Sequence, residues 1–531
     1  MLEYRSTPRI WGWMLTGLVM AACSVAPSEG DNEESTTVAM AVTTEDRLAA
    51  CSRDPRVTTG LVGTDVCAGA DIFFRETFNG NGRTCGSCHP VANNTTLDVP
   101  FVTALHDSNP NDPLFVSEIN PDLSQLETGD LRGAAAVLEN VDGFEDPTHK
   151  FVQRAVNHML SLRTSILRDP GDGTSSPPVE RTGWGGDGAP DDDGSLRAFL
   201  TGAIRQHFTK TLARREGVDF RLPTALELDL NNAFQLSLGR QNELELNSVR
   251  INDADAEDGR QAFLDPQRGR CNVCHANAGA NFIDTRLNRN FDTGIRNVVG
   301  NLDQGLTAGT MNGQAFVDGG FGATNPIDGD GIGFNNAFGD DTFNPPPLIE
   351  AADTGPFFHN NARGPEIENA VAFYASAPFN FSPAAQALEQ RFGTPLNLSP
   401  TDSLHIARFL RVLNAAFNVD IAIQRLSAAQ TIVARFADQS ADIQKTLIQL
   451  AGEELDDATR VLSVGSVGNP LYASAQTSLN ESKAETIAGI GATTAAARSS
   501  HISKALSSAR SAHAQFGTNI TFQMGQGNLM F

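Results

Sequence analysis

Two pentapeptides of the form Cys-x-x-Cys-His carry the clearest chemistry in this sequence of 531 residues. They are Cys85-Gly-Ser-Cys88-His89 and Cys271-Asn-Val-Cys274-His275. In such a motif two thiols form thioether bonds to a porphyrin, and the adjacent imidazole binds the iron. The composition, with 7 cysteines and 10 histidines, should produce only about 0.002 such motifs by chance. The sequence therefore predicts two covalently attached c-type haems, with His89 and His275 as iron ligands.

The alternative is a zinc site built from the four thiolates of both Cys-x-x-Cys pairs. Zinc ribbons usually place their pairs about 15–20 residues apart and need no histidine after either pair. Here a whole domain's length separates the two pairs, and both carry the histidine. This spacing favours haem attachment.

The first cysteine of the chain, Cys23, ends a segment typical of an export signal. The apolar run Trp11–Met20 follows two arginines and is too short to span a bilayer as a mature helix. Small residues directly before Cys23 indicate a lipoprotein signal, whose cysteine becomes the acylated N-terminus. Because Met20 is unusual at its position, ordinary cleavage nearby is the alternative. We expect a periplasmic protein, with a lipid anchor at Cys23 if the lipoprotein signal is used.

Cys51 and Cys67 are left over after haem attachment and export are accounted for. In an oxidising compartment two spare cysteines most simply form a disulfide, and a reactive thiol pair is the alternative. The formal net charge of -24 disfavours nucleic acid and anionic membrane surfaces as partners. It favours a small, basic electron-donor protein of the cytochrome c or cupredoxin type.

The elements that must position these residues are mainly helical. Helix-like stretches lead into both motifs, at Ala70–Phe78 and Asp258–Leu264, which suggests duplication of one cytochrome module. Further helical patterns cover 149–168 and 195–215, and Ser399 has the sequence context of a helix N-cap. The expected fold is mainly α, with two cytochrome c-like haem domains, long irregular loops such as 277–346 and a helical C-terminal extension. The expected segments are an export signal (1–23), a disordered tether (24–50), the N-terminal haem domain (51–240), the C-terminal haem domain (241–425) and the extension (426–531).

Two further segments resemble known sequences. One runs from Pro345 to Tyr374 and contains Gly355-Pro-Phe-Phe-His359; the other is Trp184-Gly-Gly-Asp187-Gly188. With the two haem motifs, they make residues 60–425 similar to the bacterial dihaem cytochrome c peroxidase superfamily, which includes the MauG-like enzymes. The dihaem rubber oxygenases are more distantly similar.

This resemblance implies a division of labour between the haems. The N-terminal haem would bind peroxide or dioxygen, and the C-terminal haem would store or relay an electron, with Trp184 between them. For Trp184 the plain alternative is a loop residue that fills a core. His359 would lie near a haem propionate, and Tyr374 would be the sixth ligand of the second iron. The competing ligands are Met311, His501, His513 and Met524.

The first haem pocket departs from the family pattern. The positions of the family's distal Gln and Glu fall on Phe199 and Thr209, and His207 lies two residues before the latter. An imidazole there could move a proton, because its pKa lies near neutral pH, or coordinate the resting iron; an exposed helical position is the alternative. A phenylalanine at position 199 is instead similar to the apolar pocket around the oxygen-binding haem of the rubber oxygenases.

Three functions follow from these expectations. A peroxidase-like oxidoreductase is the leading hypothesis, an oxygenase acting on an organic substrate is the second, and a dihaem electron carrier is the third. The resemblance also implies a calcium ion between the haem domains, for which Asp328-Gly-Asp330-Gly is a weak candidate.

Overall fold

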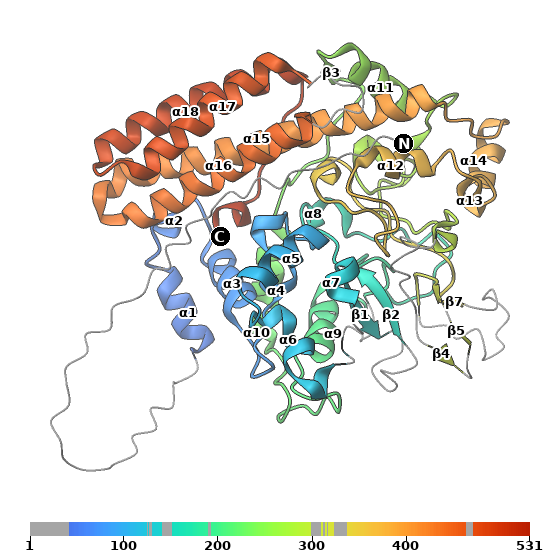
Figure 1. The fold of residues 1–531 in the computed structure, drawn as a ribbon, viewed down its shortest axis with the longest axis horizontal. Coiled ribbons are helices and arrows are strands. Elements are labelled where there is room, and N and C mark those ends of the chain that lie inside the picture. Colours follow the sequence, from blue (N-terminus) through green and yellow to red (C-terminus); the bar gives the residue numbers. More distant parts are fainter. Residues whose placement is uncertain are drawn as a thin grey trace. The chain divides into compact units, whose positions relative to one another are not determined.

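Helices dominate the computed structural model (Figure 1). It describes residues 42–531 except 125, 127–129, 141–150, 189–192, 299–309, 312–313, 316, 323–336 and 464–470. Thr43–Phe531 form one compact unit. The export signal with Cys23, most of the predicted tether and the calcium candidate at Asp328 and Asp330 lie outside the described residues. No helix in the described ranges is both long and apolar enough to cross a membrane.

The helices of the first half are α1 (Thr44–Cys51), α2 (Pro55–Thr58), α3 (Thr64–Arg75), α4 (Cys85–Cys88), α5 (Val99–Ser108), α6 (Val116–Ile119), α7 (Asp130–Ala134), α8 (Leu162–Ser165), α9 (Leu196–His207) and α10 (Ala225–Leu236). Those of the second half are α11 (Ala254–Leu264), α12 (Ile367–Phe373), α13 (Ala377–Asn380), α14 (Pro383–Phe392), α15 (Pro400–Phe436), α16 (Ala441–Ser463), α17 (Ala473–Gly491) and α18 (Ala495–Phe516).

Small two-stranded sheets complete the described fold. The longest pairs β1 (Ala136–Asn140) with β2 (Phe151–Ala155) in antiparallel register. The others pair β3 (Arg250–Ile251) with β8 (Gly517–Thr518), β4 (Thr310–Met311) with β5 (Gln314–Ala315), and β6 (Val317–Asp318) with β7 (Ala337–Phe338). The helix expected over 149–168 was therefore wrong, since its described part holds strand β2 and the single turn α8. Pairing with β1 decides the backbone conformation there, and a local apolar pattern does not reveal such a pairing.

A close helix crossing recurs in the two halves of the chain. In α3, a Cβ added at Gly69 would lie 2.0 Å from the carbonyl oxygen of Leu230 on α10. In α11, a Cβ added at Gly259 would lie 1.9 Å from the carbonyl oxygen of His405 on α15. Only glycine lets the backbones approach this closely. Each helix leads into a Cys-x-x-Cys-His motif, so the two halves share one local architecture.

Helix α15 is the central element of the second half. It begins where the sequence indicates, because the Ser399 hydroxyl accepts the Asp402 N–H at 3.0 Å. It has 37 residues, of which Phe409–Val419 are buried on all faces, and it packs against α11, α12, α16 and α18. The predicted boundary between residues 425 and 426 falls inside this helix. One face of α15 stays buried beyond it, and α15–α18 lie side by side (Figure 1).

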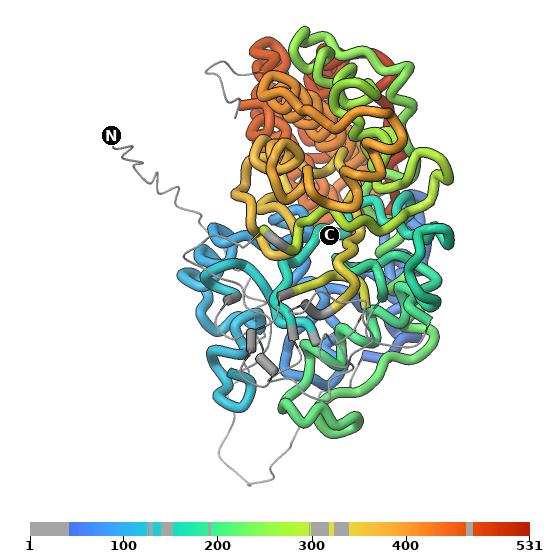
Figure 2. The backbone as a smooth tube through the Cα atoms, turned by 90° about the vertical axis from the view of Figure 1, so that its right-hand side faces the viewer, coloured from blue at the N-terminus to red at the C-terminus, as the bar shows by residue number. Residues whose placement is uncertain are grey.

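The last described residues return to the first half of the chain. Strand β8 pairs with β3, and the Arg56 guanidinium donates to the carbonyl of Leu529 at 2.9 Å. The Phe531 ring lies 5.8 Å from Phe74 on α3. The C-terminal end therefore lies beside the first helices (Figures 1 and 2). Residues 517–531 of the expected extension therefore pack against the first half, whereas α16–α18 pack on α15 and on one another.

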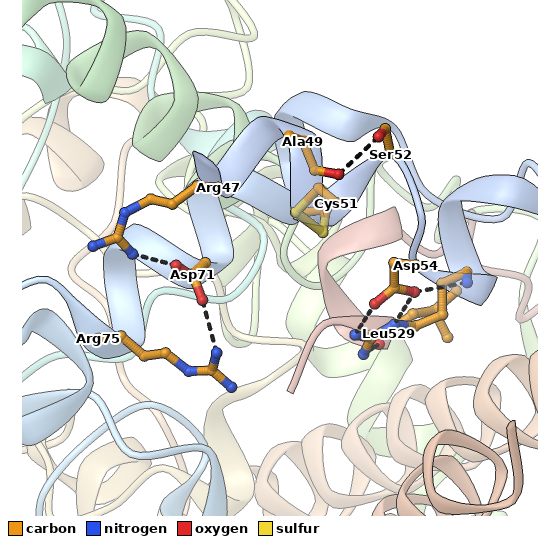
Figure 3. Close-up of a disulfide and its surroundings, with 10 residues drawn as sticks. Arg47, Ala49, Cys51, Ser52, Asp54, Asp71, Arg75 and Leu529 are labelled. Atoms are coloured by element: carbon orange, nitrogen blue, oxygen red, sulfur yellow. Dashed lines mark hydrogen bonds and ion pairs between the residues drawn. A yellow bond between two sulfur atoms is a disulfide. The ribbon is translucent and has the colours of Figure 1, made fainter. Parts of the chain in front are cut away.

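A disulfide fastens the start of the described chain. Cys51, the last residue of α1, is bonded to Cys67 in α3, as the sequence analysis expected (Figure 3). Arg47 of α1 also pairs with Asp71 of α3. Because α1 begins at Thr44, residues 44–50 do not belong to a disordered tether, and that predicted boundary was too late. The Thr43 capping box starts the helix there.

Candidate functional site

The first Cys-x-x-Cys pair lies on the single helical turn α4, directly after the α3 unit. Neither Cys85 nor Cys88 is in a disulfide, and burial raises the pKa of Cys85 to about 12. A Cβ at Gly86 would lie 2.5 Å from the Phe74 ring, so the glycine allows this turn to rest on α3. Two cysteines one helical turn apart and outside any disulfide suit thioether attachment to a porphyrin.

Both motif histidines have a fixed ring orientation. His89 Nδ1 lies 2.8 Å from the carbonyl oxygen of Thr95, and His275 Nδ1 lies 3.1 Å from that of Gly279. A carbonyl only accepts, so each Nδ1 carries the proton and each Nε2 keeps its lone pair. Burial lowers the pKa of both rings to about 4, which keeps them neutral. Neutral imidazoles held through the second nitrogen are the usual form of a metal ligand.

The second motif opens into a large, mainly apolar cavity. Its walls include Cys271, Cys274 and His275, and it encloses about 1910 Å³ not occupied by protein atoms, part of it open to solvent. Tyr374, at the C-terminal end of α12, lines the same cavity. Of the predicted sixth ligands, Tyr374 is thus placed in one space with His275.

The competing sixth ligands lie elsewhere in the described structure. His501, His513 and Met524 do not line this cavity. His501 bonds Glu485 at 2.7 Å, and His513 pairs with Asp420 at 3.4 Å. For Met311 the side chain lies outside the described residues.

Trp184 and His359 are both fastened to the end of strand β2 and line the same cavity. The Trp184 indole N–H donates to the Ala155 carbonyl at 2.9 Å, and the Ala155 N–H donates to the His359 carbonyl at 2.7 Å. His359 is 3% exposed and stacks on Phe343 at 4.3 Å. Its Nδ1 is buried and has no hydrogen-bond partner among the described residues. This ring has the free polar atom that a partner of a haem carboxylate needs.

Helix α9 contacts the Trp184 loop near one end and the segment just before the first motif at the other. A Cβ at Gly183, the residue before Trp184, would lie 3.1 Å from the ring of Phe199. Phe199 and His207 are eight positions apart on α9, which places them about 12 Å apart along the axis and about 80° apart around it. The Asn81 amide, just before the first motif, donates to the His207 carbonyl at 2.8 Å. The helix thus carries Phe199 at the Trp184 end and His207 at the first-motif end.

The His207 ring accepts a hydrogen bond through Nε2 in this structure. Its Nε2 lies 2.8 Å from the Gln206 amide nitrogen, which is a donor, so the proton belongs on Nδ1. That Nδ1 is buried without a hydrogen-bond partner among the described residues. Burial and the nearby positive charges, Arg83 and Arg214, lower the pKa of His207 to about 3. Thr209 is not a substitute for a distal acid, because its hydroxyl bonds the carbonyl of Thr211.

Two groups near these sites were missed by sequence reasoning. His158 lies on the segment after β2, lines the cavity of the second motif and has a buried Nδ1 without a hydrogen-bond partner among the described residues. Arg154 is buried and pairs with both Glu139, at 2.6 Å, and Asp318, at 2.7 Å. No local motif marks these residues, since their partners come from distant parts of the chain.

The structure tests the zinc alternative directly. All four motif cysteines are described, and the described residues hold no group of three or more His, Cys, Asp or Glu side chains placed to bind a metal ion. The two pairs therefore do not meet in a four-thiolate site. Each motif instead supplies two cysteines outside any disulfide and a neutral imidazole, and this set fits a covalently bound haem at each motif.

Comparisons with known proteins give little further guidance. No protein-family model matches the sequence, and no curated protein matches it. Among solved structures, the chain is similar to hydrazine synthase from Kuenenia stuttgartiensis, with 14% identity and a TM-score of 0.35, over 73% of this chain and 98% of that one. A similarity of this size does not establish a shared fold.

Proposed function

We propose that this chain is an exported dihaem c-type oxidoreductase with peroxidase-like activity. The observation that carries the proposal is the repeated site: a pair of cysteines outside any disulfide, each pair followed by a neutral histidine whose Nδ1 is fixed by a carbonyl. The haem held by Cys85, Cys88 and His89 would be the reaction centre. The haem held by Cys271, Cys274 and His275 would pass on electrons, and Tyr374 would be its second axial ligand.

The bound haems would supply the redox chemistry, and the chain's own side chains would control its access and protons. Reduction of one hydrogen peroxide to two waters consumes two electrons and two protons. His207 would donate a hydrogen bond from Nδ1 to a substrate oxygen at the first site. Its low pKa makes it a poor proton acceptor, so protons would arrive through water. Trp184 would position the electron path, and His359 would hold a haem carboxylate.

The expected partner is a small electron-donor protein of the cytochrome c or cupredoxin type. The chain's formal net charge of -24 favours a basic one, since opposite charge speeds encounter. The periplasm and lipidation at Cys23 are part of this proposal. Cell fractionation of the wild type and Cys23→Ser, with the mass of the mature N-terminus, tests both.

A second function is favoured by the first site itself. Phe199 lies on α9 about two turns before His207, and the pKa of His207 is too low for efficient proton uptake. An apolar site without a strong proton acceptor suits dioxygen binding better than peroxide cleavage. The alternative is thus an oxygenase that uses dioxygen on an organic substrate.

Electron paramagnetic resonance of the haem-loaded protein separates these functions. One high-spin and one low-spin ferric signal, both lost after peroxide addition, support the peroxidase-like enzyme. A high-spin signal that peroxide does not change, together with stable binding of dioxygen by the reduced protein, supports the oxygenase. Two low-spin signals that peroxide does not change, before and after partial reduction, contradict both enzyme functions and support an electron carrier.

A further inference from the structure

His158 lies where the two candidate haem sites approach each other. It is 9% exposed and lines the cavity that also holds His275 and Trp184. Its Nδ1 is buried and has no hydrogen-bond partner among the described residues. An imidazole nitrogen left this way in a cavity wall needs a polar partner from whatever fills that cavity.

The segment around His158 is also bonded to the loop that orients His89. The N–H of Met159 donates to the Thr95 hydroxyl at 2.9 Å, and the Thr95 carbonyl holds His89 Nδ1 at 2.8 Å. The hydroxyl of the next residue, Thr96, donates to the carbonyl of Val156. The chain from 156 to 159 is therefore fixed to the proximal loop of the first site, while His158 lines the cavity of the second.

Charged neighbours limit what the partner of His158 can be. The nearest electrostatic influences on its ring are Glu350 and Arg240, a fully buried ion pair joined at 2.8 Å. Glu350 also has a buried oxygen, Oε2, without a hydrogen-bond partner among the described residues. Two candidates remain for Nδ1: an acceptor on a group bound in the cavity, or a buried water shared with Glu350.

We propose that His158 donates a hydrogen bond from Nδ1 to a carboxylate side chain of the haem at the His275 site. This inference rests on the proposed function, because it requires a haem in that cavity. The carboxylates are the anionic edge of a c-type haem, and His359 offers a second free ring nitrogen in the same wall. His158 is a positioning residue shared by the two sites: it holds the second haem, and its backbone neighbour braces the loop of His89.

Reduction potentials of both haems in the holoprotein test this role. Removing a donor from a haem carboxylate leaves more negative charge beside the iron, which favours the ferric state. We expect His158→Leu to lower the equilibrium constant for reduction of the second haem about tenfold, a fall of about 59 mV. The haem carboxylate bending bands in resonance Raman spectra should shift as well. His158→Gln keeps an N–H donor and should stay near the wild type.

The matched control is His501→Leu, which removes an imidazole on α18 outside the cavity and should leave both potentials unchanged. If the wild type holds two haems and His158→Leu behaves like the control, the proposal is wrong and the water-bridged arrangement is correct. If His158→Leu does not load haem, His158→Gln decides. A second-haem potential and Raman bands equal to those of the wild type support the proposal. A shifted potential with Raman bands like those of the wild type contradicts it. A wild type that holds fewer than two covalent haems contradicts the proposed function itself.

Discussion

The glycine crossings give a sharp test of the duplicated architecture. In Gly259→Ala the new methyl group would lie 1.9 Å from the His405 carbonyl oxygen, and the obstacle is backbone. Ordinary contact begins near 3.4 Å, so α11 and α15 must separate by about 1.5 Å. Overpacking of this kind costs about 1–3 kcal/mol, and alanine's better helix propensity returns up to about 1 kcal/mol. A backbone obstacle places the cost at the upper end of that range, about 3 kcal/mol, so we expect a net loss of about 2 kcal/mol.

Urea unfolding of the holoprotein, followed by helix content and by the absorbance of each haem, measures this loss. Gly259→Ala should perturb the second haem first, and Gly69→Ala the first haem. The matched control is Gly491→Ala at the end of α17, where an added Cβ meets nothing within 4 Å; it should be neutral or stabilise by up to about 1 kcal/mol. A Gly259→Ala protein as stable as the wild type would refute the close crossing of α11 and α15.

Three further predictions address the disulfide, the tryptophan and an ion pair. Replacing Cys51 and Cys67 by serine opens a loop with a sequence separation of 16 and should lower the unfolding free energy by about 3 kcal/mol; an unchanged urea midpoint would contradict this. Trp184→Phe removes an indole N–H donor, so we expect about 1 kcal/mol less stability and, by stopped-flow spectroscopy, slower reduction of the first haem with both haems bound; an unchanged rate would remove Trp184 from the electron path. Arg268 lowers the pKa of Asp258 to about 2, below its usual value near 4. The lowered pKa contributes stability that is present above pH 4 and lost as the pH falls towards 2, so in urea unfolding the advantage of the wild type over Asp258→Asn should fade across that range; an advantage independent of pH would contradict the ion pair.

Local signals explain which parts of this structure could be predicted. The N-cap at Ser399 involves residues a few positions apart, so one stretch of sequence contains the information. The haem motifs are equally local. The pairing of Cys51 with Cys67 follows from elimination and compartment. These features need no knowledge of the tertiary fold.

The features that were missed depend on distant partners. Strand β2 was expected to be helical. Its apolar residues fit both the period of a helix and that of a strand, and only its pairing with β1 decides which conformation forms. His158 carries no motif, and its importance comes from a cavity formed by segments far apart in the chain. The expected boundary at 425 rested on a change in composition, whereas α15 continues past it with one face packed against α16 and α18.

The return of residues 517–531 to the first half has a consequence for biosynthesis. The Gly63 N–H bonds the Gln526 side chain 463 positions later, and the Arg56 guanidinium bonds the Leu529 carbonyl 473 positions later. Closing so long a loop costs little more entropy than closing a shorter one, because the cost grows with the logarithm of length. The delay is imposed by synthesis, since residues 517–531 are made after the residues they pack against. Cys85 and Cys88 are therefore made before the segment that packs beside Phe74 exists, and the first motif is enclosed only once residues 517–531 have been added.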